Sequence, residues 1–200
     1  MEYDYMKRFI FTALCALLFA ACVQNVHSQN IIGDRTSIPQ GNVITIDDFE
    51  KGNYWIWAGF DWEQWGPSKL STSARISNQW ASQGKQSLEC KVIASTQTSD
   101  TDGMFFMDYN WDFSGAKYVI VDIYNPENKS FELGIAFQAT ENWSWKETSN
   151  VVIKPGKHTV VLSLEEFQDV LYLVKRINIC YREKDRINGR FYIDNMRLVK

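Results

Sequence analysis

Two pairs of tryptophans have the residue type and spacing that stacking against a sugar ring requires. Trp143 and Trp145 are two residues apart, so their indoles share one face if the segment is extended. Trp62 and Trp65 lie in a polar stretch that cannot easily bury both side chains. The C–H face of a pyranose stacks on aromatic rings, and nearby polar groups then bind its hydroxyls. The four tryptophans are therefore candidate ligand residues, with packing into the core as the alternative for each.

A weaker candidate is a polar pair towards the C-terminal end of the chain. Asn178 and Arg182 alternate with apolar residues, so they occupy the opposite face of a predicted strand. Polar side chains on such a face could hydrogen-bond a glycan. The alternative interpretation is an ordinary solvated sheet face.

The residues on which most enzymes depend are scarce. His158 is the only histidine beyond residue 28, at the start of a predicted strand, where a surface position is expected. It leaves no second histidine for a zinc site, and the sequence has no glycine-rich phosphate loop. A Glu-x-Asp-x-x-Glu strand, usual in β-sandwich glycosidases, does not occur either. The sequence therefore predicts that the protein is not an enzyme.

The N-terminal residues have the layout of a secretory signal peptide. A basic pair precedes an almost wholly apolar run over 9–21, which is too short to cross a bilayer. Cleavage after Ser28 is one expected exit, and lipidation of Cys22, which follows a sequence resembling a bacterial lipobox, is the other. We expect 1–28 to be a signal peptide and the protein to be exported, to the periplasm, cell surface or extracellular space. No transmembrane anchor is predicted, and a lipid anchor stays open.

Composition limits the partners further. The chain of 200 residues carries 21 basic and 24 acidic side chains, a net charge of -3, which gives no indication of a nucleic-acid partner. Residues 29–200 have the length of one domain with its own core. Cys90 and Cys180 are expected to be buried small side chains, with a disulfide between them as the alternative.

Strand signals follow one another from residue 42 to the end of the chain. Alternation of apolar and polar residues is clearest at 87–94 and 131–139. Residues 29–41 are polar, contain glycine and proline, and indicate a flexible lead-in. Further strands are predicted at 43–46, 117–124, 151–153, 158–164, 174–182 and 191–199. With no helical segment long enough for a βαβ crossover, we expect an all-β fold, a single β-sandwich or jelly roll over 42–200.

Four short motifs occur in order along this domain. They are FEKG at 49–52 followed by Trp55, GKQSL at 84–88, WDFSG at 111–115 and YIDNMRL at 192–198. Together they resemble the carbohydrate-binding modules of the galactose-binding-like β-sandwich superfamily, often attached to bacterial polysaccharide-degrading enzymes. The resemblance implies packing roles for Trp55, Trp80 and Trp111. Residues 54–80 match no pattern of the family, so no ligand residue is carried over from that stretch.

The resemblance also implies one structural calcium ion. In that family a calcium often lies where the first and last strands meet. Asp48 and Glu50 share one strand face, and Asp194 occupies the matching place in the last strand. With backbone carbonyls from the turn at 85–86 they would form the oxygen cage that calcium prefers. The alternative is that the first two are exposed strand-end acids and the third caps a turn.

Two functions from different classes follow. The first is non-catalytic binding of an extracellular polysaccharide or oligosaccharide, marked by a pair of tryptophans exposed together. The alternative is a protein-binding or structural component of a cell-envelope assembly, marked by buried tryptophans and a contiguous apolar surface elsewhere. A jelly-roll lyase or glycosidase ranks behind both, because it requires titratable groups clustered in a cleft.

Overall fold

The computed structural model describes residues 30–58, 60–61, 66–67, 71–93, 101–183 and 188–200. The predicted signal peptide, the lipobox cysteine Cys22, and Trp62 and Trp65 lie outside the described residues. Within the described ranges no helix is both long and apolar enough to cross a membrane.

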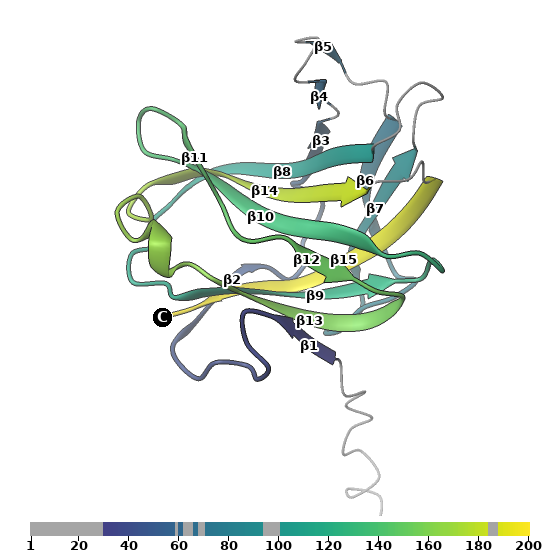
Figure 1. The fold of residues 1–200 in the computed structure, drawn as a ribbon, viewed down its shortest axis with the longest axis horizontal. Coiled ribbons are helices and arrows are strands. Elements are labelled where there is room, and N and C mark those ends of the chain that lie inside the picture. The colour runs from purple at the N-terminus through teal and green to yellow at the C-terminus, as the bar shows by residue number, and fades with distance from the viewer. Residues whose placement is uncertain (1–29, 59, 62–65, 68–70, 94–100, 184–187) are drawn as a thin grey trace, which may run out of the picture.

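Two large β-sheets packed face to face form the fold, as Figure 1 shows. The first sheet has the order β1 (Asn30–Gly33), β13 (Gly156–Ser163), β9 (Tyr118–Asn125), β15 (Asn188–Val199), β7 (Ser87–Ile93), β6 (Ser71–Ser77), with β2 (Val43–Asp47) on β15. The second has the order β11 (Ser144–Glu147), β10 (Phe131–Ala139), β14 (Val174–Glu183), β8 (Thr101–Trp111), β3 (Ile56–Ala58), with β12 (Val151–Ile153) on β10. A two-stranded ribbon, β4 (Phe60–Asp61) and β5 (Gly66–Pro67), and a short 3-10 helix, η1 (Glu165–Phe167), complete the described elements. The predicted β-sandwich is confirmed.

The core lies between the sheets and is built by alternate residues of each strand. Leu88, Cys90 and Val92 of β7 point into it, as the alternation predicts, and Ile177 and Ile179 of β14 do the same from the other sheet. Trp55 and Trp80 are buried, and Trp111 packs partly buried against the core, as expected for packing residues. Cys90 and Cys180 are both buried, and neither forms a disulfide.

Strand β8, between β14 and β3 in the second sheet, is the largest element that the alternation did not reveal. Phe105 and Met107 face the core, but their neighbour Phe106 is also half-buried, on the opposite face of the sheet. Apolar residues on both faces hide the two-residue period that identifies a half-buried strand.

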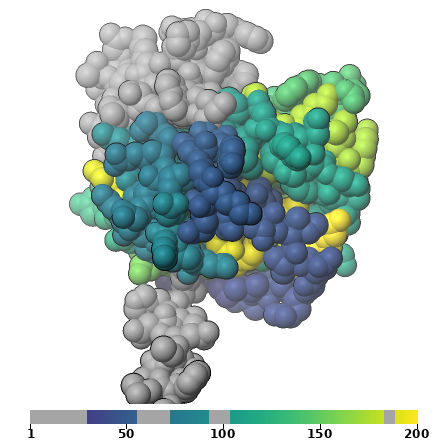
Figure 2. Space-filling model, turned by 180° about the vertical axis from the view of Figure 1, so that it is seen from behind, coloured from purple at the N-terminus to yellow at the C-terminus, as the bar shows by residue number. Residues whose placement is uncertain are grey.

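Residues 30–33, within the segment expected to be a flexible lead-in, form the strand β1. It pairs in parallel with β13, from Asn30 opposite His158 to Gly33 opposite Val161. Ile31 packs against a small apolar cluster on the outer face of the first sheet, formed by Tyr118, Ile120, Val161 and Val199. Covering this cluster ties the segment to the sheet. Figure 2 shows the purple and blue N-terminal chain beside the yellow last strand, β15, with which β2 pairs.

The expectation of a surface position for His158 is wrong. The side chain is buried and shares the inner side of β13 with Val160 and Leu162. Its Nε2 lies 2.8 Å from the carbonyl oxygen of Lys154. The alternation along 158–162 already places the histidine on the core side.

Candidate functional site

Trp143 lies in the turn from β10 to β11 and Trp145 in β11 itself, and both are exposed, at 44% and 40% of their surface. Thr140 and Trp143 adopt left-handed backbone conformations, with φ of 64° and 56°, and the Trp143 N–H donates to the Thr140 carbonyl at 3.2 Å. A left-handed conformation costs a non-glycine residue about 1–2 kcal/mol. Backbone strain that holds a side chain exposed is typical of functional positions.

Strand register places further polar residues on the same outer face of the second sheet. Trp145 of β11 is opposite Gln138 of β10, which is opposite Arg176 of β14, which is opposite Asp108 of β8. Residues directly opposite one another in antiparallel strands project to the same side. The outer face of the second sheet, with its exposed indoles, is called the tryptophan face below.

Arg176 connects the turn to the sheet. Its Nε and Nη2 donate to the two carboxylate oxygens of Asp108 at 2.5 and 2.8 Å. Its guanidinium lies 4.0 Å from the Phe106 ring centroid and 5.5 Å from that of Trp143. Lys175 lies 5.4 Å from the same indole and pairs with Glu141 at 2.6 Å. Two-point binding of a planar guanidinium fixes its orientation, so the Trp143 indole has a defined position beside it.

A second cluster joins Trp145 to Arg182. The indole N–H of Trp145 donates to Oε2 of Glu147 at 3.2 Å, and Oε1 of Glu147 accepts from Nη1 of Arg182 at 2.6 Å. The same Nη1 donates to Oδ1 of Asn150 at 2.7 Å. The structure therefore brings together two residues predicted separately from the sequence, through Glu147. The two-residue spacing from Trp145 to Glu147 indicates that these two side chains share a face, whereas nothing in the sequence indicates Asn150.

Asn178 shares the tryptophan face but is fully buried, at 0% exposure. It lies opposite Ala136 on one side and Phe106 on the other. Its Nδ2 donates to the Ala136 carbonyl at 3.3 Å, and Oδ1 has no partner in the described part of the chain. Asn178 is therefore neither a solvated side chain nor a ligand residue at the surface. Its amide lies beneath the face.

The predicted calcium ligands are already occupied by backbone N–H groups. Oε1 of Glu50 accepts from Lys85 N and Gln86 N, both at 2.7 Å, so the turn presents donors rather than carbonyls to it. Oδ2 of Asp194 accepts from the backbone nitrogens of the loop at 82–83, and Oδ1 of Asp48 accepts from Glu50 N at 3.2 Å. No group of three or more metal-ligating side chains converges anywhere in the described ranges. This arrangement does not fit the calcium cage implied by the resemblance.

Burial raises the pKa of two carboxyl groups near the predicted calcium ligands, those of Asp194 and Asp47. Desolvation raises the pKa of Asp194, although its hydrogen bonds from Gln83 N and Ser82 act in the opposite direction. Desolvation likewise raises the pKa of Asp47, which accepts hydrogen bonds from Phe49 N and from the Trp55 indole. Both carboxyl groups serve the packing of the first sheet and its connections.

Comparison with known proteins gives no match in sequence and a clear match in structure. No protein-family model matches the chain, and no curated protein matches it. The family 11 carbohydrate-binding module of Clostridium thermocellum, solved with a β-1,3-1,4-mixed-linked tetrasaccharide, is 14% identical with a TM-score of 0.55, covering 80% of this chain and 97% of that one. A family 28 module specific for non-crystalline cellulose is 17% identical with a TM-score of 0.57, over 80% and 97%.

A third similar structure is CBM27-1 of Caldicellulosiruptor saccharolyticus with mannohexaose, 15% identical with a TM-score of 0.55, covering 80% of this chain and 98% of that one. These neighbours are carbohydrate-binding modules. At such low identity the likeness concerns the fold alone. The chain has the fold of the β-sandwich carbohydrate-binding modules, as its sequence motifs indicate.

Proposed function

We propose that the protein binds carbohydrate without catalysis, through the tryptophan face of its second sheet. The observation that carries the proposal is the joint exposure of Trp143 and Trp145 beside hydrogen-bonding groups held by ion pairs. Indoles stack on the apolar faces of sugar rings, and the polar groups around them bind the hydroxyls.

The charges of this face favour a neutral ligand. Arg176 pairs with Asp108, Lys175 with Glu141 and Arg182 with Glu147, so neither sign is in excess. An acidic glycan would require cations that are not already balanced. The ligands named for the structural neighbours, a mixed-linkage tetrasaccharide and mannohexaose, are neutral and lend support to this choice.

The alternative of a protein-binding envelope component required the tryptophans to be buried, and the exposure of Trp143 and Trp145 gives it no support. We retain export as an expectation, because it would bring the tryptophan face to extracellular polysaccharides. A mature N-terminus determined by mass spectrometry would distinguish cleavage after Ser28 from lipidation of Cys22.

Calorimetric titration with soluble mixed-linkage β-glucan, mannan and hydroxyethylcellulose tests the proposal. We expect binding of at least one, weakened about tenfold or more by either Trp143→Ala or Trp145→Ala, since a factor of ten corresponds to about 1.4 kcal/mol. Tyr54→Ala is the matched control. Tyr54 is 63% exposed and follows Asn53, which donates to Ala74 of β6, at an edge of the first sheet, whereas β11 is at an edge of the second.

Two results would contradict the proposal. One is a folded protein that binds none of these glycans. The other is binding that survives unchanged when both tryptophans are replaced together.

A further inference from the structure

Three aromatic side chains lie together on the outer face of the first sheet, separate from both apolar clusters. Tyr124 of β9 is directly opposite Tyr192 of β15, and their rings stack at 5.9 Å with an interplanar angle of 18°. Trp80 tilts against both, at 5.7 and 6.5 Å. None of the three belongs to the main core or to the cluster around Tyr118. The packing between the sheets therefore does not account for them.

These tyrosines are the centre of a row that crosses five strands. Successive register partners are Lys157, Tyr124, Tyr192, Glu89 and Arg75, on β13, β9, β15, β7 and β6. Lys157 Nζ lies 5.9 Å from the Tyr124 ring centroid. Arg75 donates to Oε1 of Glu89 at 2.9 and 3.2 Å. Glu89 is only 2% exposed, and its Oε2 has no hydrogen-bond partner among the described residues.

Two shallow pockets open on this row and adjoin at Gln79. The first, of about 360 Å³, is lined by Gln79, Tyr124, Pro126, Glu127, Arg190 and Tyr192. The second, of about 310 Å³, is lined by Arg75, Ile76, Ser77, Asn78, Gln79 and Gln86. Oε1 of Gln79 accepts a hydrogen bond from the Tyr192 hydroxyl at 2.6 Å, so this side chain stands where the pockets meet. We call the two pockets together the tyrosine groove.

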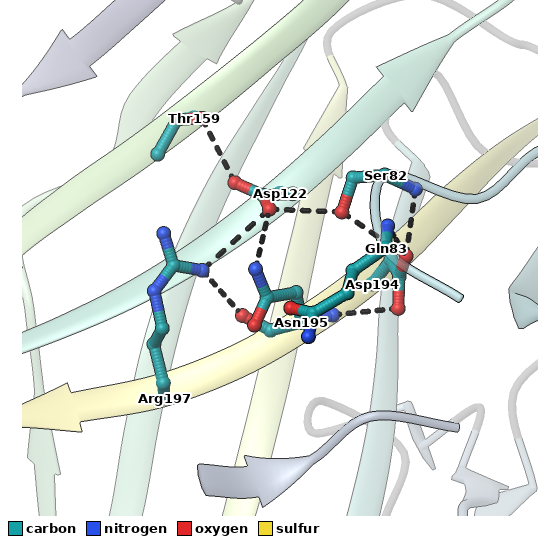
Figure 3. Close-up of polar contacts among 7 residues, drawn as sticks. All are labelled: Ser82, Gln83, Asp122, Thr159, Asp194, Asn195 and Arg197. Atoms are coloured by element: carbon teal, nitrogen blue, oxygen red, sulfur yellow. Dashed lines mark hydrogen bonds and ion pairs between the residues drawn. The ribbon is translucent and has the colours of Figure 1, made fainter. Parts of the chain in front are cut away.

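A buried polar network holds one wall of the groove in place. Figure 3 shows Ser82 and Gln83 directed at Asp194, whose Oδ2 accepts their backbone N–H groups at 2.7 and 2.9 Å. The Ser82 hydroxyl lies 2.8 Å from Oδ2 of Asp122 and 3.0 Å from that of Asp194. Asp122 also accepts from Thr159 and from Asn195. The loop that carries Gln79 and Trp80 is thus tied to the sheet, and the groove is formed before any ligand arrives.

We propose that the tyrosine groove is a second binding site, for a short neutral saccharide. It combines the half-buried ring of Tyr124, which is backed by the buried Tyr192 and Trp80, with an amide and charged groups of both signs. This is the chemistry that recognises the faces and hydroxyls of a sugar. Of the charged residues that line the two pockets, Arg75 is balanced by Glu89, and Arg190 lies with Glu127, which favours a neutral over an acidic ligand. The groove shares no residue with the tryptophan face, and the inference does not depend on that face.

Backbone amide NMR on the Trp143→Ala/Trp145→Ala double variant tests the groove with the first site removed. Cellobiose and mannobiose are the probes, titrated to millimolar concentration. We expect at least one of them to cause saturable shifts of the amides of Gln79, Tyr124, Arg190 and Tyr192. Gln79→Ala should weaken this binding about tenfold, which corresponds to the loss of about 1.4 kcal/mol. Tyr124→Leu should also weaken the binding. Because Gln79 is exposed, Gln79→Ala tests the groove without disturbing the packing of the three aromatic side chains.

Wild-type titrations then separate the two sites. Shifts in the groove that persist in the double variant and are weakened by Gln79→Ala support the second site. The inference is overturned if neither disaccharide shifts these amides in a folded protein, or if Gln79→Ala and Tyr124→Leu leave the shifts unchanged. A wild-type protein that shifts only around Trp143 and Trp145 would overturn the groove alone, and one that shifts only in the groove would overturn the tryptophan face alone.

Discussion

The two outer faces of the sandwich use carboxylates in opposite ways. On the first sheet, Asp122 and Asp194 are buried, and N–H and O–H groups of the loop and neighbouring strands surround them. On the second sheet, Asp108 and Glu141 keep 45% and 82% of their side-chain surface exposed while pairing with cations. Buried and saturated carboxylates hold backbone in place, whereas exposed pairs can exchange partners with a ligand. The first arrangement serves the fold, and the second is suited to recognition.

The aromatic side chains differ in the same way. Trp80 is buried against two tyrosines, whereas Trp143 is exposed on a strained turn. Aromatic content alone therefore does not identify a binding face. What distinguishes the tryptophan face is exposure supported by groups that fix the ring's position.

The largest effect is expected where a saturated carboxylate is removed. Asp194→Ala leaves the backbone N–H groups of Ser82, Gln83 and Asn195 without their acceptor. We expect the free energy of unfolding to fall by about 3 kcal/mol, measured by urea denaturation. Glu166→Gln, at an exposed position, should stay within about 0.5 kcal/mol of the wild type. Equal stability of the two variants would refute the structural role of the network.

A smaller effect, and on binding instead of folding, is expected at the exposed pairs. Arg176→Ala removes the guanidinium between Phe106 and Trp143, so glycan affinity should fall about tenfold, equivalent to about 1.4 kcal/mol. The free energy of unfolding should fall by less than about 1 kcal/mol because the pair is near the surface. Lys91→Ala, at an exposed position of β7, is the control. If Arg176→Ala greatly lowered the stability and left the glycan affinity unchanged, the pair would serve the fold and not recognition.

The free energy of unfolding should depend on pH because the Asp194 carboxyl is buried. Burial raises the pKa of Asp194 above its ordinary value of 3.8, so the folded state takes up a proton before the unfolded state does. The resulting stabilisation is complete below the ordinary value and is lost as pH rises through the raised pKa. The stability of the wild type relative to Asp194→Asn should therefore be greater at about pH 4 than at about pH 7. Urea titrations at both pH values measure it, and an opposite trend would contradict the burial effect.

The smallest effect is expected from metal removal. Because the oxygens of Glu50 and Asp194 already accept backbone N–H groups, calcium or a chelator should move the Tm by less than about 1 °C. Differential scanning calorimetry with calcium and then with chelator is the measurement. A clear rise of the Tm with calcium would show that these carboxylates rearrange around an ion.

The sequence predicted the sandwich because several of its strands alternate cleanly, and it predicted individual site residues without their partners. Trp143 and Trp145 could be selected from spacing alone. The Arg176–Asp108 pair joins residues 68 positions apart through the register of β14 on β8, a strand whose apolar residues lie on both faces. Asn178 follows the alternation correctly, but its burial depends on neighbours in two other strands. Register between strands is the information that local patterns lack.

For a domain held through its N-terminal segment, the place of β1 would set the direction in which the tryptophan face points. The chain joins the sandwich at Asn30, in the strand at the edge of the first sheet, and Figure 1 shows β1 on the opposite side of the sandwich from β8, β14 and β10. A domain held from this side would turn the tryptophan face outward. Several copies on one surface would then offer parallel faces to a single long polysaccharide, and weak contacts at each would add up to firm attachment.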